Sequence, residues 1–347
     1  MQDWQQSMRQ AMVDPMELAE RFGIDSAPLQ RVARRYPMRI SPYYLSLIEE
    51  SGDPLWRQCV PDEQELTDPT GSADPLDEER LSPTPAVVHR YPDRVLLLVG
   101  SECATYCRFC TRKRKLGCSS MTISEEDLAA GIDYIASRPE VRDVLLSGGD
   151  PLLLEDDQLE AILLRLRAVP HVEMVRIGSR LPVTLPERIT DDLCKLLRRF
   201  SPLYLNTHFN HPRELTPQAA AACVRLADAG IVLGNQTVLL RGVNDSAETL
   251  ASLWRGLLRL RVRPYYLHHM DLVRGTGHFR TRIETGLGIL RELRGPLSGM
   301  ALPQYVIDSP GGKGKIPLLP EYLLSLGDQA QLKTATGEII QFPNYEI

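Results

Sequence analysis

Cys103, Cys107 and Cys110 form the densest group of reactive side chains in the sequence. Thiolates spaced four and three residues apart can bind one small inorganic cluster. Because three cysteines leave one iron of a four-iron cluster without a protein ligand, that iron stays open to a small molecule. Zinc fits less well, since structural zinc takes four protein ligands and no second Cys or His pair lies at a usual spacing. The spacing therefore predicts an iron–sulfur cluster rather than a set of unconnected core cysteines.

A second reactive segment is the glycine-rich run over residues 308–317, which contains Lys313 and Lys315. A lysine in such a run can reach into a closed site and leave it again, which suits a covalent bond to pyridoxal phosphate (PLP). Taken alone, a Gly-Lys-Gly-Lys tract is more often a solvated basic turn. On the residues alone, both lysines are candidates.

Charged residues near these two segments indicate what the site binds. Asp271 follows an expected strand, Asp308 opens the glycine-rich run, and Arg112 lies two residues beyond the last clustered cysteine. Two carboxylates in one cavity repel each other unless a cation lies between them, so a ligand ammonium is the economical partner. Arg112 can bind an α-carboxylate through two parallel hydrogen bonds. Together the three residues predict a basic amino acid as ligand, although any single aspartate is more often on the surface.

Further polar residues follow the expected strands. In Ser147-Gly148-Gly149-Asp150 the glycines let a ligand approach the backbone, and exposed N–H groups can bind a carboxylate. The Gly-Gly pair alone is a weak signal, because loops after strands often contain it for turn geometry. Four histidines are more simply walls of a pocket than metal ligands: His208, His211, His268 and His269.

Short apolar runs alternate with amphipathic helical stretches, and these elements must position the reactive residues. The predicted strands are 95–99, 144–147, 174–178, 203–209, 232–240 and 263–268, with 303–306 as an additional candidate. The predicted helices are 14–22 and 42–50 near the N-terminus, then 125–136, 157–166, 191–200, 217–229 and 247–258. Thr122 and Glu125 predict a capping box at the start of the helix over 125–136.

Strands that alternate with helices usually pair in parallel, so the chain is expected to be α/β. The pattern predicts a partial or near-complete (β/α)6 TIM-like barrel, with a doubly wound open sheet as the competing architecture. In both, ligands bind at the carboxyl ends of the strands. We expect an N-terminal helical cap and wrapping segment over residues 1–85, the barrel core over 86–300, and a C-terminal segment with the reactive lysine and a polar tail over 301–347.

Composition excludes several classes of protein. The chain has 347 residues, 43% of them hydrophobic, which is enough for a large core. The net charge of -5 gives no general field for nucleic acid, and the basic run over 108–115 lacks interleaved aromatic residues. No apolar run approaches the roughly 18 residues of a membrane helix, and the N-terminus has no secretory signal. We expect a cytoplasmic protein without nucleic-acid or membrane partners.

The C-x3-C-x2-C motif after the first barrel strand resembles that of the radical S-adenosylmethionine (SAM) enzymes, and its surroundings resemble lysine 2,3-aminomutase. The likeness runs from about residue 30 to residue 325. It rests on His89-Arg90-Tyr91-Pro92-Asp93-Arg94, Thr111-Arg112-Lys113-Arg114, Leu145-Leu146-Ser147-Gly148-Gly149-Asp150-Pro151, Arg176-Ile177-Gly178-Ser179-Arg180, Asn206-Thr207-His208-Phe209-Asn210-His211-Pro212, Gly234-Asn235-Gln236 and Leu239-Leu240-Arg241-Gly242-Val243-Asn244-Asp245.

This resemblance implies a radical SAM barrel that binds a [4Fe-4S] cluster, SAM and PLP. The implied cluster ligands are Cys103, Cys107 and Cys110. The implied SAM contacts are Ser147, Gly148, Gly149 and Asp150 for the methionyl part, with His208 and Gln236 as further contacts. For PLP the resemblance implies Arg90 and Lys315, because Lys315 alone precedes the family's Ile-Pro; Lys313 departs from the all-glycine run of the family. The implied lysine contacts are Asp271 and Asp308 for the side-chain ammonium, and Arg112 for the α-carboxylate.

The activity implied is an isomerase that converts L-lysine to L-β-lysine by moving the amino group from carbon 2 to carbon 3. A one-electron donor such as flavodoxin or ferredoxin would reduce the cluster. A related glutamate mutase has non-acidic residues in place of the two aspartates, so the pair favours lysine. Alternatives are a different basic amino acid as substrate, a role in supplying β-lysine for modification of a translation elongation factor, and a non-catalytic iron–sulfur or zinc module. No zinc is expected, since Ser246 stands where longer family members have a cysteine, and the oligomeric state is left open.

Overall fold

A single curved sheet of nine strands dominates the computed structural model, which describes residues 3–117 and 122–344. The strands neighbour one another in chain order, β1 to β9. They are β1 (Val87–Tyr91), β2 (Arg94–Leu98), β3 (Asp143–Ser147), β4 (Met174–Gly178), β5 (Leu203–Thr207), β6 (Val232–Leu239), β7 (Val262–His269), β8 (Gln304–Asp308) and β9 (Lys315–Leu318). A doubly wound sheet reverses its strand order partway, so the sequential order excludes that architecture.

Strands β2 to β8 pair in parallel, whereas β1 and β9 pair antiparallel with the two ends of this parallel set. All six predicted strands are confirmed, and the additional candidate over 303–306 is β8. Helices connect the parallel strands, as this pairing requires. They are α7 (Glu125–Ala136), α8 (Asp156–Arg167), α9 (Leu181–Thr184), α10 (Asp191–Arg198), α11 (Pro217–Asp228), α12 (Ala247–Arg259) and α13 (Ile283–Leu293).

The sheet curls around a cavity of about 730 Å³ whose lining includes side chains from all nine strands. Along β3, for example, Leu145 faces this cavity, while Val144 and Leu146 are fully buried in the hydrophobic core. This alternation follows from the two-residue period of a strand. The predicted TIM-like barrel is therefore confirmed as a curled sheet with an internal cavity.

Six helices precede the sheet within the described residues, and the first five contribute side chains to the same hydrophobic core as the barrel. They are α1 (Asp3–Arg9), α2 (Pro15–Phe22), α3 (Ser26–Ala33), α4 (Pro42–Ser46), α5 (Pro54–Cys59) and α6 (Gln64–Thr67). The predicted helix over 14–22 is confirmed, but the one over 42–50 ends earlier, at Ser46. The reason is that Asp53 accepts a hydrogen bond from the Glu49 N–H (2.9 Å) and caps α5, so the chain turns there.

The predicted capping box is shifted by two residues. Helix α7 begins after Ser124, whose hydroxyl accepts a hydrogen bond from the Asp127 N–H (3.0 Å), and the Asp127 carboxylate accepts one from the Ser124 N–H (3.1 Å). The Thr122 prediction was wrong because a second Ser-x-x-Asp pair lies closer to the first apolar turn, and both pairs satisfy the capping pattern.

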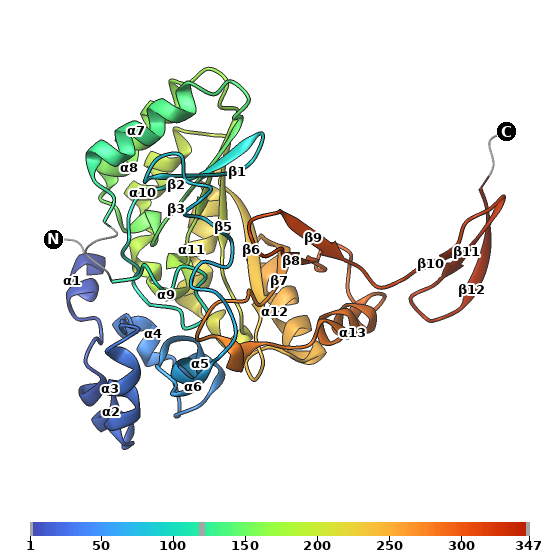
Figure 1. Ribbon diagram of the computed structural model, residues 1–347, viewed down its shortest axis with the longest axis horizontal. Helices are drawn as coiled ribbons and strands as arrows, with labels where there is room; N and C mark the ends of the chain where they lie inside the picture. The colour runs from blue at the N-terminus through green and yellow to red at the C-terminus, as the bar shows by residue number, and fades with distance from the viewer. Residues whose placement is uncertain (1–2, 118–121, 345–347) are drawn as a thin grey trace.

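The C-terminal residues do not form the expected polar tail. They fold into a separate three-stranded antiparallel sheet of β10 (Leu323–Ser325), β11 (Gln329–Lys333) and β12 (Ile339–Pro343). This sheet stands away from the barrel (Figure 1) and leaves large apolar side chains exposed, among them Leu326, Ile339 and Phe342. The apolar alternation in these strands is weak, which explains why the sequence pattern missed them.

None of the helices within the described residues combines the length and the apolar content needed to cross a membrane.

Two loops at the carboxyl ends of neighbouring strands are in direct backbone contact. The N–H groups of Gly149 and Asp150, after β3, donate to the carbonyl oxygens of Gly100 and Glu102, after β2 (both 2.7 Å). A Cβ added to Gly149 would lie 2.1 Å from the Glu102 oxygen. Glycine is therefore required because another loop packs against the backbone here.

We expect Gly149→Ala to displace the loop that carries the three cysteines, and thus to lose most of the iron bound on anaerobic reconstitution with iron and sulfide. Gly288→Ala is the matched control, because a Cβ at this position in α13 meets no atom within 4 Å. The control should keep its iron and gain up to about 1 kcal/mol of stability from helix propensity. Iron content per folded chain, with circular dichroism to verify folding, gives the answer; equal iron in both variants would contradict the prediction.

Candidate active site

The three clustered cysteines lie in the irregular loop that follows β2. All three are free thiols. Burial raises the pKa of Cys103 well above its ordinary value, and it raises the pKa of Cys110 to about 11. The neighbouring Asp150 carboxylate and the other two thiols add to the rise at Cys103. In the cofactor-free protein Cys103 and Cys110 are therefore protonated, so metal binding must release their protons.

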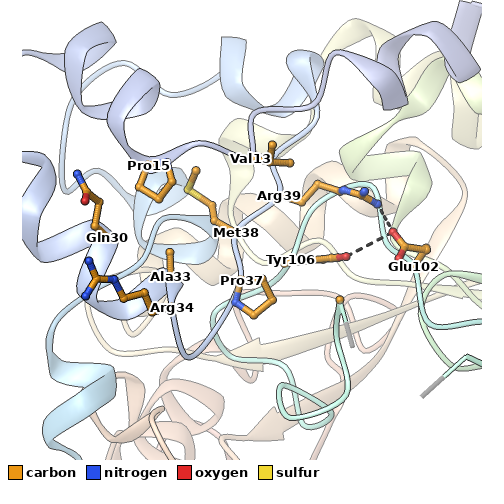
Figure 2. Close-up of a pocket in the computed structure, with 11 residues that line it drawn as sticks. Val13, Pro15, Gln30, Ala33, Arg34, Pro37, Met38, Arg39, Glu102 and Tyr106 are labelled. Atoms are coloured by element: carbon orange, nitrogen blue, oxygen red, sulfur yellow. Dashed lines mark hydrogen bonds and ion pairs between the residues drawn. The ribbon is translucent and has the colours of Figure 1, made fainter. Parts of the chain in front are cut away.

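N-terminal residues hold the outer side of this loop (Figure 2). Arg39 forms an ion pair with Glu102, and the Tyr106 hydroxyl donates to the same carboxylate (3.4 Å). The Tyr106 N–H donates to the Arg39 carbonyl oxygen (2.8 Å). These contacts form one wall of a surface groove of about 540 Å³. The residues that precede Cys103 and Cys107 are thus fixed to the N-terminal segment.

Deeper in the loop, Glu65 lies between two cations. Its carboxylate contacts Arg108 (2.5 Å) and Lys113 (2.6 Å), and all three side chains are less than 5% exposed. Arg108 also donates to the Pro37 carbonyl oxygen (2.9 Å). A buried ion pair contributes mainly when its geometry is well satisfied, as it is here. The N-terminal segment is therefore part of the cysteine site.

The thiols fit an iron–sulfur cluster. Among residues 3–117 and 122–344, no group of three or more His, Cys, Asp or Glu side chains converges on one point as ligands of a single metal ion. The three free cysteines of one loop offer each of three irons in a four-iron cluster its own thiolate.

The backbone N–H groups in the loop after β3 do not have the partners that the sequence predicted. The N–H groups of Gly149 and Asp150 already donate to the cysteine loop, so they are not available for a ligand carboxylate. The Asp150 side chain accepts from the backbone N–H groups of Arg180 (2.7 Å) and Leu152 (3.1 Å). Burial raises the pKa of Asp150 to about 6. Contacts of SAM with residues 147–150 stay a prediction, and they must use other atoms than these.

Five of the sequence-predicted residues line the barrel cavity: Arg90, Arg112, Gln236, Asp308 and Lys315. Arg112 also lines a second cavity of about 350 Å³, together with Gly148 and Gly149. The Arg112 Nη1 donates to the Ser147 Oγ (3.2 Å), which connects the loop after β3 to the barrel cavity. The structure thus brings together in one cavity the predicted PLP residues and two of the three predicted substrate residues, whereas Asp271 is not among the residues that line it.

Lys315 and Asp308 form the central ion pair of the cavity. The Lys315 Nζ lies 2.5 Å from the Asp308 Oδ2, and Arg90 Nη1 lies 2.8 Å from the Asp308 Oδ1. Although burial opposes it, the Lys315 ammonium holds the pKa of Asp308 below its ordinary value. The two residues come together because β8 and β9 pair antiparallel with Asp308 opposite Lys315. The sequence analysis expected Asp308 on a substrate ammonium, and in this state the ammonium of Lys315 occupies that position.

Lys313 does not share this environment. It is exposed, whereas Lys315 is half-buried and lines the cavity. Arg90 adds a second sign of a ligand, since its buried Nη2 has no hydrogen-bond partner. An unpaired guanidinium nitrogen beside a half-buried lysine fits an anionic group such as the phosphate of PLP. The geometry therefore favours Lys315 over Lys313.

Arg112 is already held by an acid that sequence reasoning missed. Glu78 accepts hydrogen bonds from the Arg112 Nε (3.0 Å) and Nη2 (2.7 Å). Against the burial that would raise it, the Arg112 guanidinium keeps the pKa of Glu78 below its ordinary value. This pairing occupies the side of the guanidinium that carries Nε. A substrate carboxylate would have to bind the end formed by Nη1 and Nη2.

Asp271 is the unpaired acid of the site. Its Oδ1 is buried and has no hydrogen-bond partner. Burial raises the pKa of Asp271 to about 7, and the Asp308 carboxylate adds to the rise, while Lys315 and Arg90 oppose it. A buried carboxylate without a partner is costly unless a cation reaches it. A cation near Asp271 would offset this cost.

Two histidines near the cavity are neutral. Burial lowers the pKa of His268 to about 3 and that of His208 to about 4, and neighbouring cations add to both shifts. His268 lies 3.6 Å from Asp308 through its Nδ1 and contacts the Tyr266 ring edge-on (5.4 Å between centroids). Neither histidine is among the residues that line the cavity of about 730 Å³, and contacts of His208 and Gln236 with SAM stay predictions.

In the cofactor-free protein, burial of the Asp271 carboxyl should lower the free energy of unfolding at high pH. The unfolded carboxyl has a pKa of about 3.9 and the folded one about 7, so the folded state keeps a proton that the unfolded chain loses between these values. Stability therefore falls as pH rises from about 4 to 7. Asp271→Asn should unfold at a higher temperature than the parent at pH 8, by up to about 4 kcal/mol in free energy, and this gain should shrink toward pH 4.

Thermal unfolding at pH 4, 6 and 8 tests this, with the exposed helix residue changed in Asp133→Asn as the matched control. The control should follow the parent at every pH. An Asp271→Asn variant that is no more stable than the parent at pH 8 would show that the carboxyl is not strained by burial.

Comparisons with known proteins agree with these features. Residues 97–253 match the Radical SAM superfamily, and residues 290–346 match the family described as Lysine-2,3-aminomutase. An L-lysine 2,3-aminomutase from Fusobacterium nucleatum is 48% identical over 93% of this chain and 77% of its own length. Another from Clostridium subterminale is 46% identical over 98% and 83%. A glutamate 2,3-aminomutase from Clostridioides difficile is 44% identical over 97% and 81%.

Identity of this extent, together with a curled parallel sheet, three grouped cysteines and a cavity lysine, leads to one conclusion. The chain belongs to the lysine 2,3-aminomutase family of radical SAM enzymes.

Proposed function

We propose that this protein converts L-lysine to L-β-lysine by moving the amino group from carbon 2 to carbon 3. The observation that carries the choice of lysine is the unpaired, buried Asp271 beside Asp308. Asp308 is already paired with Lys315 and Arg90, so Asp271 is the acid that still lacks a cation, and the side-chain ammonium of lysine supplies it. A glutamate side chain would bring a third negative charge to the same place, which disfavours the substrate named for the Clostridioides relative.

Each cofactor supplies chemistry that the side chains lack: a one-electron cleavage of SAM by the reduced cluster starts radical chemistry, and PLP activates the amino group for migration. Cys103, Cys107 and Cys110 hold the cluster. Lys315 would hold PLP covalently, and the unpaired Nη2 of Arg90 would bind an anionic group of PLP. A protein donor such as flavodoxin or ferredoxin delivers the electron.

The two ends of the substrate are fixed by groups that other residues orient. Arg112 binds the α-carboxylate, and its guanidinium is prevented from rotating by Glu78 and Ser147. Asp271 binds the distal ammonium. Fixing both ends places carbons 2 and 3 at one position in the cavity, which is the main contribution that binding makes to a rearrangement.

The cavity is covered by contacts between two distant segments. The Gly311 N–H, in the loop before Lys315, donates to the Pro75 carbonyl oxygen (2.9 Å). A Cβ at Gly312 would lie 2.6 Å from the Leu76 oxygen, so this loop packs tightly on the N-terminal segment. Leu76 and Glu78 also line the cavity. Such a cover excludes water and so protects radical intermediates.

Anaerobic reconstitution with iron, sulfide, PLP and SAM tests the proposal. The reconstituted protein is incubated with lysine and dithionite, and the amino acids are separated by chromatography. β-Lysine is the expected product. Conversion of another basic amino acid but not lysine would assign a different substrate, and the absence of both a PLP absorption band and 5′-deoxyadenosine would leave only a non-catalytic iron–sulfur module.

Lys315→Ala should abolish the visible absorption band of bound PLP and the conversion of lysine, because the covalent attachment is lost. Lys313→Ala is the matched control two residues away. It should retain the band and most of the activity, since Lys313 is exposed and does not line the cavity. Spectra taken before and after addition of lysine read out both variants; loss of the band in Lys313→Ala alone would reverse the assignment.

Asp271→Asn should lose lysine turnover while it keeps the cluster absorbance and its ability to cleave SAM. Removing one partner of a buried charge pair costs about 2–5 kcal/mol, which corresponds to a loss of 30-fold or more in kcat/KM. Single-turnover measurement of 5′-deoxyadenosine separates SAM cleavage from lysine conversion. Loss of the cluster in this variant would show that Asp271 acts on the cysteine loop instead.

A further inference from the structure

A buried arginine donates a hydrogen bond to one of the grouped cysteines. Arg180 follows β4, and its Nη1 lies 2.8 Å from the Cys107 Sγ. Only 9% of the Arg180 side chain is exposed. Hydrogen bonds that involve an ionised donor are roughly twice as strong as neutral ones. A guanidinium in this position therefore acts strongly on the electron density of the sulfur.

Other contacts keep the guanidinium in place. The Arg180 Nη2 donates to the Gln58 Oε1 (2.6 Å) and to the Glu214 Oε1 (2.9 Å). The Arg180 Nε donates to the His208 carbonyl oxygen (3.1 Å). Gln58 and Glu214 are fully buried. Because Nε and Nη2 are both engaged, Nη1 cannot turn away from the sulfur without breaking several bonds.

The group that holds Arg180 joins three parts of the fold. Gln58 belongs to α5 in the N-terminal segment, and Glu214 lies after β5. The Tyr44 hydroxyl, from α4, donates to the same Glu214 oxygen (2.7 Å). The Asn210 amide donates to the Gln58 Oε1 (3.0 Å). Helices α4 and α5 thus hold Arg180, which contacts the cysteine loop. This connection between the N-terminal segment and the loop is separate from the one made by Glu65.

Arg188 shows what a buried arginine does elsewhere in the same barrel. It is also fully buried, but it donates to the carbonyl oxygens of Leu152 (2.7 Å) and Leu154 (2.9 Å) and pairs with Asp156. Those contacts stabilise a loop and reach no thiol. Arg180 also donates to a sulfur atom, whereas Arg188 stabilises its loop through oxygen acceptors alone. A contact with sulfur is therefore not required for a buried arginine to hold a loop in place.

We propose that Arg180 is a positioning residue that raises the reduction potential of the iron–sulfur cluster through its hydrogen bond to Cys107. The inference rests on the cluster assigned under the proposed function. Reduction adds one electron to the cluster from an external donor, and no bond or proton changes place. The reduced cluster carries one more negative charge on iron and sulfur, so a cationic N–H donor stabilises it more than the oxidised cluster.

The test is a redox titration of the reconstituted protein without lysine or SAM, followed by electron paramagnetic resonance of the reduced cluster. At a fixed potential, Arg180→Gln should lower the ratio of reduced to oxidised cluster by about tenfold, or ~59 mV for a one-electron couple. Arg188→Gln is the matched control, and its midpoint should equal that of the parent. A parent-like midpoint in Arg180→Gln, or the same shift in Arg188→Gln, would overturn the proposal.

A second measurement covers the case in which Arg180→Gln does not bind iron. Protein labelled with 15N-arginine should show a 15N coupling to the reduced cluster in pulsed double-resonance spectra, and Arg180→Lys should lose it. No 15N coupling in the parent would overturn the proposal. Neither readout needs lysine turnover, so a shifted midpoint in a protein that does not form β-lysine would count against the proposed substrate and leave this inference intact.

Discussion

The cysteine loop has almost no regular structure of its own, and the rest of the fold is arranged to hold it in place. The backbone after β3 contacts it through Gly149, Arg180 reaches it from the end of β4, and Glu65 holds it from the N-terminal segment. A loop held by only one neighbour would lose its geometry when any single contact loosened. Because the contacts come from three directions, the positions of the three thiols depend on β3, β4 and the N-terminal segment together.

Charge balance is the second organising feature of the site. Within the cavity region, Asp308 is paired with Lys315 and Arg90, and Glu78 is paired with Arg112. Asp271 is left over as an acid whose Oδ1 has no partner. Unpaired charge is expensive in a buried place, and proteins retain it mostly where function needs it. This imbalance supports the proposal that a cation binds at Asp271.

Much of the barrel could be predicted from the sequence, because apolar runs of strand length and helical periodicity repeat regularly from residue 95 onward. The grouping of Asp308 with Lys315 could also be predicted, since both lie in one short glycine-rich run. Glu78 and Arg180 could not be assigned roles. Glu78 sits in a polar, proline-rich segment whose pattern predicts a solvated loop, and its burial depends on Arg112, which is distant in sequence. Arg180 reaches Cys107 across 73 residues.

The backbone donors after β3 illustrate a different limit. A Gly-Gly pair predicts close approach of something to the backbone, but it does not say whether a ligand or another loop makes the approach. Here the approaching group is Gly100 and Glu102. The small sheet β10–β12 escaped prediction for a related reason, since its strands lack both strict alternation and a core to face.

The ion pair between Lys315 and Asp308 also determines how the cavity fills. The cofactor-free chain already carries an internal ammonium beside Asp308, so this carboxylate is paired before anything enters the cavity. A ligand ammonium that takes the place of Lys315 there exchanges one cation for another, so the Asp308 carboxylate stays paired throughout.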